Sequence, residues 1–352
     1  MSHSLSQLFD IVLEKGASDL HICEGASPQI RIDGELYPVG SATLSADECR
    51  NLCYEQVLPE QIKSFEETWE LDIAVNHKTK ARFRVNLSYQ RGSITGAYRP
   101  IPTIIPKPED LGIPQMAMNL TLKPRGLVLV TGPTGSGKST TLAAMIDRIN
   151  EVRSEHIITV EDPIEYLHTS KKCLIAQREV EKDTQNFGAA LKRVLRQDPD
   201  VVLIGEMRDL ETIATAITVS ETGHLVFATL HTNTAVQTVN RIIDVFPAHQ
   251  QPQIRTQLSF ILEGILSQQL IPKKDGGRAL AMEILVPTSA IRNLIREDKI
   301  HQIYAAMQMD QARSGMQTMN QSLVKLVKEG KISKESAMDY CTEMEEIKKL
   351  LS

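Results

Sequence analysis

Eight consecutive residues, Gly132 to Ser139, constrain this chain more than any other segment. They read Gly-Pro-Thr-Gly-Ser-Gly-Lys-Ser and match the phosphate-binding pattern G-x-x-x-x-G-K-[ST] at every fixed position. The preceding run, Gly126 to Thr131, predicts a short buried strand, and Thr140 to Arg153 predicts a helix. A chance glycine-rich turn is the alternative. The flanking strand and helix favour a loop that binds a nucleoside triphosphate.

Each residue type in this loop has a part in holding phosphate. Glycines let the backbone curl so that successive N–H groups point at phosphate oxygens, and the helix N-terminus adds partial positive charge. Lys138 is placed to reach the β- and γ-phosphates, and the Ser139 hydroxyl is placed to hold Mg²⁺. The predicted nucleotide-binding residues are Gly132, Pro133, Thr134, Gly135, Ser136, Gly137, Lys138, Ser139 and Thr140.

The composition is that of a globular protein with more than one domain. The chain has 352 residues, of which 41% are hydrophobic and 24% charged, so two or three domains are expected. No apolar run is long enough to span a membrane and the first residues lack signal-peptide features, so we expect a cytoplasmic protein. The net charge of −5 argues against a motor that moves along nucleic acid. The five scattered cysteines include no C-x-x-C pair and predict reduced core thiols.

A proline-rich segment from Arg99 to Pro114 divides the chain, because proline fixes φ and removes a hydrogen-bond donor. We expect four parts: an N-terminal α+β domain over 1–98, an extended linker over 99–115, a nucleotide-binding domain over 116–288 and a helical region over 289–352. The pattern within the N-terminal domain predicts a first helix that stops near Gly16, a hairpin over Pro28–Val39 that turns at Asp33-Gly34, a helix over Ser45–Phe65, and strands over Trp69–Val75 and Ala81–Tyr98.

Two arginines occupy one face of a predicted strand in this domain. Apolar and polar residues alternate from Ala81 to Tyr89, which places Arg82 and Arg84 on the face away from the core. That face can be ordinary solvated surface. The residues alone do not decide between surface and site.

After the phosphate-binding loop, buried strands alternate with helices. This alternation predicts a parallel sheet covered by helices. The predicted strands are His156–Asp162, Val201–Glu206 and Leu225–Leu230, and the predicted helices are Phe187–Gln197 and Asp209–Thr222. From Thr234 onward we expect mostly helix, with one hairpin over Leu270–Val286.

Polar residues directly follow three of these strands. They lie at the carboxyl ends of the strands, which is where ligands bind in parallel sheets. Glu206 is placed to hold Mg²⁺ or to orient the attacking water, although a surface carboxylate in a turn is the alternative. Glu161 has an equivalent position on another strand and is expected to support the metal or the water. His231 is placed to sense the γ-phosphate or to contact a neighbouring subunit, but a lone histidine is more often structural.

Four motifs in this order resemble those of the secretion ATPases, the hexameric motors of type II secretion and type IV pili. The segments GPTGSGKSTTLAAMID, ITVEDPIE, VLIGEMRDLETI and TGHLVFATLHTN resemble the Walker A, Asp box, Walker B and His box of that family. The resemblance extends over nearly the whole chain. It implies a PAS-like N-terminal domain, a RecA-like P-loop ATPase domain and a homohexameric ring that hydrolyses ATP with Mg²⁺.

The resemblance also implies roles for individual residues. In this family, arginines of the N-terminal domain reach over the nucleotide, so Arg82 and Arg84 are the candidates, with Arg99 in reserve. Such arginines stabilise charge on the γ-phosphate and couple domain rotation to the nucleotide state. The implied catalytic residues are Lys138, Glu161, Glu206, His231, Arg82 and Arg84, and the implied metal ligands are Ser139, Glu161 and Glu206. The division of work between the two glutamates stays open.

One further segment concerns the direction of the motor. The run AIRNLIRE, Ala290 to Glu297, resembles a signature of the pilus-retraction ATPases. Its apolar positions share a helix face, leaving Arg292, Arg296 and Glu297 toward solvent or a partner, and an ordinary amphipathic helix is the alternative. The extra N-terminal domain and tetracysteine motif of extension and secretion members are absent from this sequence.

We therefore predict an ATPase that drives type IV pilus retraction. The implied partners are further copies of the chain, an inner-membrane platform protein at the pilus base and a paralogous retraction ATPase, without nucleic acid or a membrane span. The nearest alternative is the accessory retraction paralogue. An extension or secretion ATPase, a nucleic-acid translocase and a non-hydrolysing scaffold are more distant alternatives.

Overall fold

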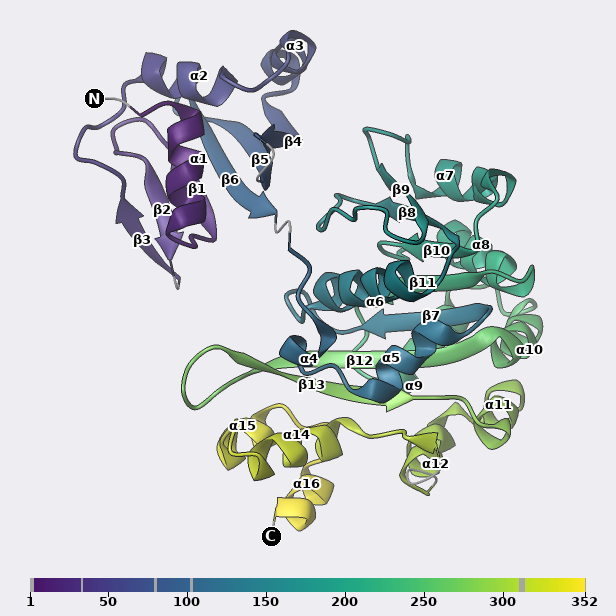
Figure 1. Ribbon diagram of the computed structural model, residues 1–352. Helices are drawn as coiled ribbons and strands as arrows, with labels where there is room; N and C mark the ends of the chain where they lie inside the picture. Colours follow the sequence, from purple (N-terminus) through teal and green to yellow (C-terminus); the bar gives the residue numbers. More distant parts are fainter. Residues whose placement is uncertain (1–2, 33, 79–80, 102–103, 310–313, 352) are drawn as a thin grey trace. The chain divides into compact units, whose positions relative to one another are not determined.

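The computed structural model describes residues 3–32, 34–78, 81–101, 104–309 and 314–351 (Figure 1). The chain divides into two compact units, Met1–Ile104 and Ile105–Ser352. The first unit contains, in chain order, α1 Leu5–Glu14, β1 Asp19–Ile22, β2 Gln29–Ile32, β3 Glu35–Pro38, α2 Ala46–Tyr54, α3 Pro59–Thr68, β4 Glu70–His77, β5 Ala81–Gln90 and β6 Ser93–Ile101.

The first unit is built on a six-stranded antiparallel sheet in the order β3-β2-β1-β6-β5-β4. Helix α1 begins with a capping box, in which the Ser4 and Gln7 side chains bond each other's backbone N–H groups. The helix buries its apolar side against the sheet, where the rings of Phe9 and Phe83 stack with centroids 3.8 Å apart. This unit therefore has a hydrophobic core of its own.

Two details of the first unit differ from the predicted elements. The helix predicted over 45–65 is two helices, because Pro59 cannot continue a helix but fits the first turn of a new one. The predicted linker is partly regular structure, because β6 continues to Ile101, opposite Arg82 of β5, and a short helix begins at Pro108. The predicted hairpin is confirmed by the pairing of Ile32 with Glu35, while Asp33 lies outside the described residues.

The second unit begins with α4 Pro108–Leu111, α5 Gln115–Asn119, η1 Leu120–Leu122, β7 Gly126–Thr131, α6 Lys138–Val152, β8 His156–Glu161, β9 Leu174–Glu179, α7 Phe187–Val194, η2 Leu195–Gln197 and β10 Val201–Ile204. It continues with α8 Leu210–Glu221, β11 Leu225–Leu230, α9 Ala235–Asp244, α10 Gln251–Ile261, β12 Leu262–Pro272 and β13 Arg278–Leu285. The last elements are α11 Ser289–Arg296, η3 Ile300–Gln302, α12 Ile303–Met309, α14 Met319–Lys328, α15 Lys334–Asp339 and α16 Met344–Leu351.

A seven-stranded sheet in the order β13-β12-β7-β11-β10-β8-β9 forms the centre of this unit. Neighbouring strands are parallel except for β12 and β13, which are antiparallel. The predicted parallel α/β sheet is therefore confirmed. The expectation of helix from Thr234 to Leu270 is confirmed by α9 and α10 but is wrong over residues 262–269, where β12 already begins at Leu262 and pairs with β7. Strand β9 also has no counterpart among the predicted strands.

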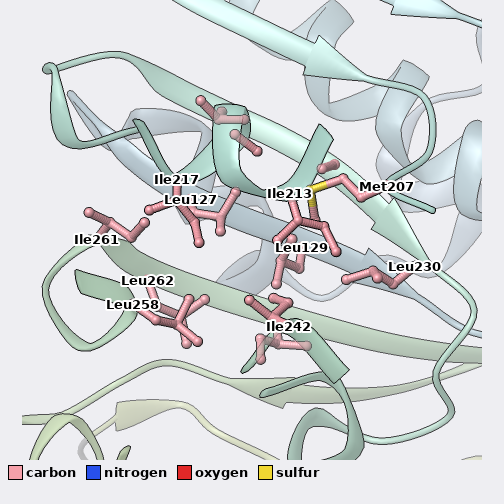
Figure 2. Packing of buried hydrophobic residues seen from close by; sticks show 14 of the residues in the cluster. Leu127, Leu129, Met207, Ile213, Ile217, Leu230, Ile242, Leu258, Ile261 and Leu262 are labelled. Carbon is pink, nitrogen blue, oxygen red and sulfur yellow. The ribbon is translucent and has the colours of Figure 1, made fainter. Parts of the chain in front are cut away.

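Alternate residues of β7 face two separate cores. Leu127 and Leu129 pack with residues of α8, α9 and α10 on one face of the sheet, as Figure 2 shows. Val128 and Val130 pack on the other face with α5 and α6. A strand buried on both faces reads as a continuous apolar run, which is how β7 was recognisable from the sequence.

The C-terminal helices α14, α15 and α16 form a smaller cluster beside β13 (Figure 1). Leu323 of α14 and Ile347 of α16 are fully buried there, together with Ile271 of β12. None of the helices in the described part of the chain has the length and apolar character that a bilayer crossing needs.

Candidate functional site

The phosphate-binding loop connects β7 to α6 and passes very close to β12. Gly132 has a φ of +144°, and a Cβ there would lie 2.3 Å from the Gln268 carbonyl oxygen. The Gln268 side chain is buried and its Nε2 donates a 2.7 Å hydrogen bond to the carbonyl oxygen of Ser136. The loop is therefore held against a strand that follows it by more than one hundred residues, and glycine is required at its first position.

Lys138 lies at the start of α6 and faces the loop. Its Nζ donates to the carbonyl oxygens of Gly132 and Pro133, at 2.9 and 3.1 Å. Partial burial lowers the pKa of Lys138, while the nearby carboxylates of Glu206 and Glu165 oppose that shift. Lys138 is thus a cation in a site that also holds carboxylates, as binding of a phosphate with its metal requires.

Strand register brings the predicted site residues to one edge of the sheet. Val160 of β8 lies opposite Ile204 of β10, and Leu230 of β11 lies opposite Thr131 of β7. The residues that follow these positions are Glu161, Gly205, His231 and Gly132, so Glu161, Glu206, His231 and the loop gather at the carboxyl ends of the parallel strands.

Glu206 is the centre of a small charge network. Its two carboxylate oxygens accept hydrogen bonds from Nε and Nη2 of Arg208, at 2.6 and 2.8 Å, and Nε2 of His231 lies 3.1 Å from Oε1. Partial burial opposes ionisation, but Arg208, His231 and Lys138 together hold the pKa of Glu206 below its ordinary value. Glu206 is therefore an anion at neutral pH, as a water-orienting or metal-supporting group must be.

Glu161 has the opposite electrostatic character. Thr159 Oγ1 and Gln177 Nε2 both donate to its Oε1, at 2.7 and 3.1 Å. Burial nevertheless outweighs these two hydrogen bonds and raises the pKa of Glu161 from 4.5 to about 7. The two carboxylates thus differ in their readiness to hold a proton, which is the usual basis for dividing acid and base work.

The raised pKa of Glu161 predicts a measurable dependence of stability on pH. The unfolded chain releases this proton near pH 4.5, whereas the folded chain keeps it up to about pH 7. The free energy of unfolding therefore falls as the pH rises from 4.5 to about 7, by up to about 3 kcal/mol. Glu161→Gln removes this pH dependence, because the amide does not titrate.

We expect urea unfolding in the presence of a chelator to show the effect. The difference in unfolding free energy between wild type and Glu161→Gln should change between pH 4.5 and 7 and stay constant above that range. A difference that is the same at every pH contradicts the assigned environment of Glu161.

The structure shows three site residues that the sequence reasoning did not single out. Gln268 holds the loop, Arg208 forms a two-pronged pair with Glu206, and the Tyr166 hydroxyl lies 3.0 Å from Thr140 Oγ1. Arg208 follows Glu206 by two residues, a spacing that could have suggested the pair. Gln268 gave no such signal, because its strand was expected to be a helix.

The candidate arginines belong to the first unit, on strands β5 and β6. Arg84 is exposed and Arg82 is 8% exposed, although both lie on the strand face opposite to Phe83 and Val85. Arg99 lies across from Arg84 in the sheet and forms an ion pair with Asp19 at 2.8 Å. Of the three, Arg84 is the exposed guanidinium without an ion pair among the contacts described.

The AIRNLIRE segment forms α11, but Arg292 does not point to solvent as expected. Its guanidinium donates to the carbonyl oxygens of Ser259 and Phe260 and to Glu263, at 2.7, 3.0 and 3.1 Å. Cations are stabilised at helix C-terminal ends, and these carbonyls belong to the last turn of α10. Arg296 lies over the Phe260 ring, with 5.7 Å between guanidinium carbon and ring centroid. Arg292 and Arg296 therefore hold α11 against α10.

Comparison with known proteins places this site in a family. Residues 112–347 match the family model described as type II/IV secretion system protein. The chain belongs to this family. It is therefore a nucleotide-binding ATPase with the P-loop fold, which confirms the resemblance of the four motifs.

Relatives match over both units. PilT, a type IV pilus retraction ATPase of Pseudomonas aeruginosa, is 48% identical over 95% of this chain and 97% of its own length. PilU, a type IV pilus ATPase of the same organism, is 40% identical over 98% of this chain and 90% of its own. The crystal structure of the pilus retraction motor PilT with bound ADP superposes with a TM-score of 0.94 at 48% identity, covering 99% of this chain and all of that one.

Proposed function

We propose that this chain is the ATP-hydrolysing motor that powers type IV pilus retraction. The observation that carries the proposal is the match to the retraction motor over both units, at 48% identity and a TM-score of 0.94, with the phosphate loop, Glu206 and His231 gathered at one edge of the sheet. A nucleic-acid translocase has no support in the net charge of −5.

The proposed mechanism starts from the loop. The backbone of residues 132–140 binds the phosphates, and Lys138 leaves the loop carbonyls to contact the β- and γ-phosphates. Glu206 orients the attacking water, and Arg208 and His231 hold its carboxylate in place. Glu161 serves as a second carboxylate with a higher proton affinity. Hydrolysis then depends on positioning more than on covalent chemistry.

Mg²⁺ is part of the proposal, and the donor set fits it. The described residues hold no cluster of three or more His, Cys, Asp or Glu side chains able to bind a metal. Mg²⁺ in nucleotide sites takes one or two protein oxygens and completes its shell with phosphates and water, so a preformed cluster is not required. Ser139 supplies a hydroxyl, and Glu206 and Glu161 supply carboxylates, which are the hard oxygen donors that Mg²⁺ prefers. The ion would neutralise phosphate charge there.

The site needs a further cation for the γ-phosphate, and we assign this role to the first unit. Arg84 is the strongest candidate because it is exposed, while Arg82 and Arg99 are held within the sheet or by Asp19. A homohexameric ring supplies this arginine across domains or subunits, and its movement couples the nucleotide state to work on the inner-membrane platform protein.

Replacing Arg84 by Ala is expected to lower kcat for ATP about tenfold with little change in ADP affinity, because the charge acts on the transition state. Arg50→Ala, an exposed arginine on α2 of the same unit, is the matched control and should leave kcat unchanged. The measurement is steady-state phosphate release. Equal kcat for both variants would remove Arg84 from the site.

The direction of the motor is tested by deleting the gene in its own organism. The proposal expects cells that still carry surface pili, fail to retract them and do not twitch. Loss of surface pili would indicate an extension motor. Retraction that persists in the deletion strain would indicate the accessory retraction paralogue.

A further inference from the structure

Glu283 of β13 is a buried carboxylate that the mechanism above does not use. It is 1% exposed. Its Oε1 accepts a 2.7 Å hydrogen bond from the backbone N–H of Ala235, and its Oε2 accepts a 3.4 Å hydrogen bond from the backbone N–H of Met319. Ala235 is the first residue of α9, and Met319 is the first residue of α14. A single carboxylate therefore joins the N-termini of two helices.

The energetics explain why an anion is tolerated there. Burial raises the pKa of Glu283, and the two backbone hydrogen bonds oppose that shift. Each helix N-terminus carries partial positive charge and unpaired N–H groups, so an anion between two of them recovers part of the cost of its burial. The carboxylate can do this only while both helix starts stay within hydrogen-bond distance. It thereby fixes their relative position.

One of the two helix starts lies next to the catalytic network. His231, whose Nε2 is 3.1 Å from Glu206, is separated from Ala235 by three residues. Thr232 and Thr238 share a 2.7 Å hydroxyl hydrogen bond, and the Thr234 side chain caps α9, so this connection is short and stiff. A displacement of Ala235 therefore displaces His231.

The outer side of this connection faces a cavity of about 710 Å³. Asn233, Thr234 and Gln237 line it on one side, and Thr342 and Glu343 of the C-terminal region line it on another. Packing from outside thus does little to hold the loop between β11 and α9. From inside, the buried Ala235 and its hydrogen bond to Glu283 hold the end of this loop.

We propose that Glu283 is a positioning residue that couples the C-terminal helices to the catalytic loop. Helix α14 packs on β13 and shares a hydrophobic cluster with α15 and α16, so the three move together. A partner that binds these helices, or a load applied to them, changes the position of His231 relative to Glu206 through the Glu283 carboxylate. The inference rests on the proposed ATPase function of the chain.

The first test is Glu283→Gln in the full-length protein. Glutamine keeps one acceptor oxygen but turns an NH₂ group toward a backbone donor, so one of the two contacts is lost. We expect kcat for ATP to fall about tenfold, because small displacements of catalytic groups are costly, and KM and ADP affinity to stay within about twofold. KM and ADP affinity are unaffected because Glu283 does not touch the phosphate-binding loop.

Ala235→Pro provides an independent variant. It removes the N–H that donates to the Glu283 carboxylate and places the ring Cδ against that oxygen, so the contact is lost, while proline is tolerated at the first position of a helix. The preceding residue, Thr234, has φ −135° and ψ 159°, which is the conformation that a residue before proline adopts. We expect the same loss of kcat as for Glu283→Gln.

Ser322→Ala is the matched control. The Ser322 hydroxyl on α14 accepts from the N–H of Met282, at 3.0 Å, so this change removes one contact between β13 and α14 but leaves both backbone hydrogen bonds of Glu283 in place. It should lower the melting temperature while leaving kcat unchanged.

A loss of kcat in Glu283→Gln and Ala235→Pro, without one in Ser322→Ala, supports the inference. If all three variants lose thermal stability but keep wild-type kcat, Glu283 only stabilises the fold and the inference is overturned. A wild-type chain that does not hydrolyse ATP in the same assay would overturn the proposed function, and the inference with it.

Discussion

Replacing Glu206 by Gln is expected to abolish ATP turnover while preserving nucleotide binding. The carboxylate accepts two hydrogen bonds from Arg208 and lies beside His231, and Arg208, His231 and Lys138 hold its pKa below the ordinary value. The amide keeps the shape of the side chain but loses the charge that orients and activates water. Positioned acid–base groups of this kind contribute about 10²- to 10⁴-fold, so we expect a fall in kcat of about a thousandfold.

Two measurements check this result. Phosphate release gives kcat, and displacement of a fluorescent ADP analogue gives affinity, which should stay within about threefold because the phosphate loop is untouched. Glu211→Gln is the matched control. Glu211 is an exposed carboxylate in the first turn of α8, paired with Lys192, and its loss should not change kcat. Steady hydrolysis in Glu206→Gln would refute its catalytic role.

Gly132→Ala is expected to weaken nucleotide binding severely. An alanine Cβ would lie 2.3 Å from the Gln268 carbonyl oxygen and 2.7 Å from Ser136 Oγ, and the φ of +144° is one that L-residues rarely adopt. The backbone cannot keep its path, so the loop N–H groups turn away from the phosphates. We expect affinity for ATP to fall by about a hundredfold or more, since exact placement of these donors carries the binding.

The control for this variant has the backbone strain of a positive φ but lacks the close contact with Gln268. Gly276 at the β12–β13 turn has a φ of +87°, and a Cβ there meets no atom within 4 Å. Gly276→Ala therefore carries a comparable conformational penalty far from the loop and should bind ATP normally. Isothermal titration with ATP compares the two variants. Wild-type affinity in Gly132→Ala would contradict the close approach of the loop to β12.

The part of the site that could be predicted is the part encoded by local pattern. Gly132 to Ser139 identifies its own loop, and the buried runs before Glu206 and His231 place these residues at strand ends. Parallel pairing then brings them together, as it does in any sheet of this kind. The spacing could not reveal the electrostatics. The contrast between a low pKa at Glu206 and a raised pKa at Glu161 arises from burial and neighbours in three dimensions.

The unpredicted part depends on contacts between distant segments. Residues 262–267 show no clear alternation, and they form a strand because they pair with β7 across the sheet. Gln268 and its bond to the loop follow from that pairing. Arg292 was expected in solvent because an isolated helix exposes it. In the folded chain it instead donates hydrogen bonds to carbonyl groups in the last turn of α10.

Live imaging of labelled pili in cells that lack the chromosomal gene shows whether ATP hydrolysis by this chain drives retraction. We expect the wild-type chain to restore retraction, whereas cells with the Glu206→Gln chain should extend pili and not retract them. Retraction at wild-type frequency in cells that contain only Glu206→Gln would contradict the account, because the motor would then work without ATP hydrolysis by this chain.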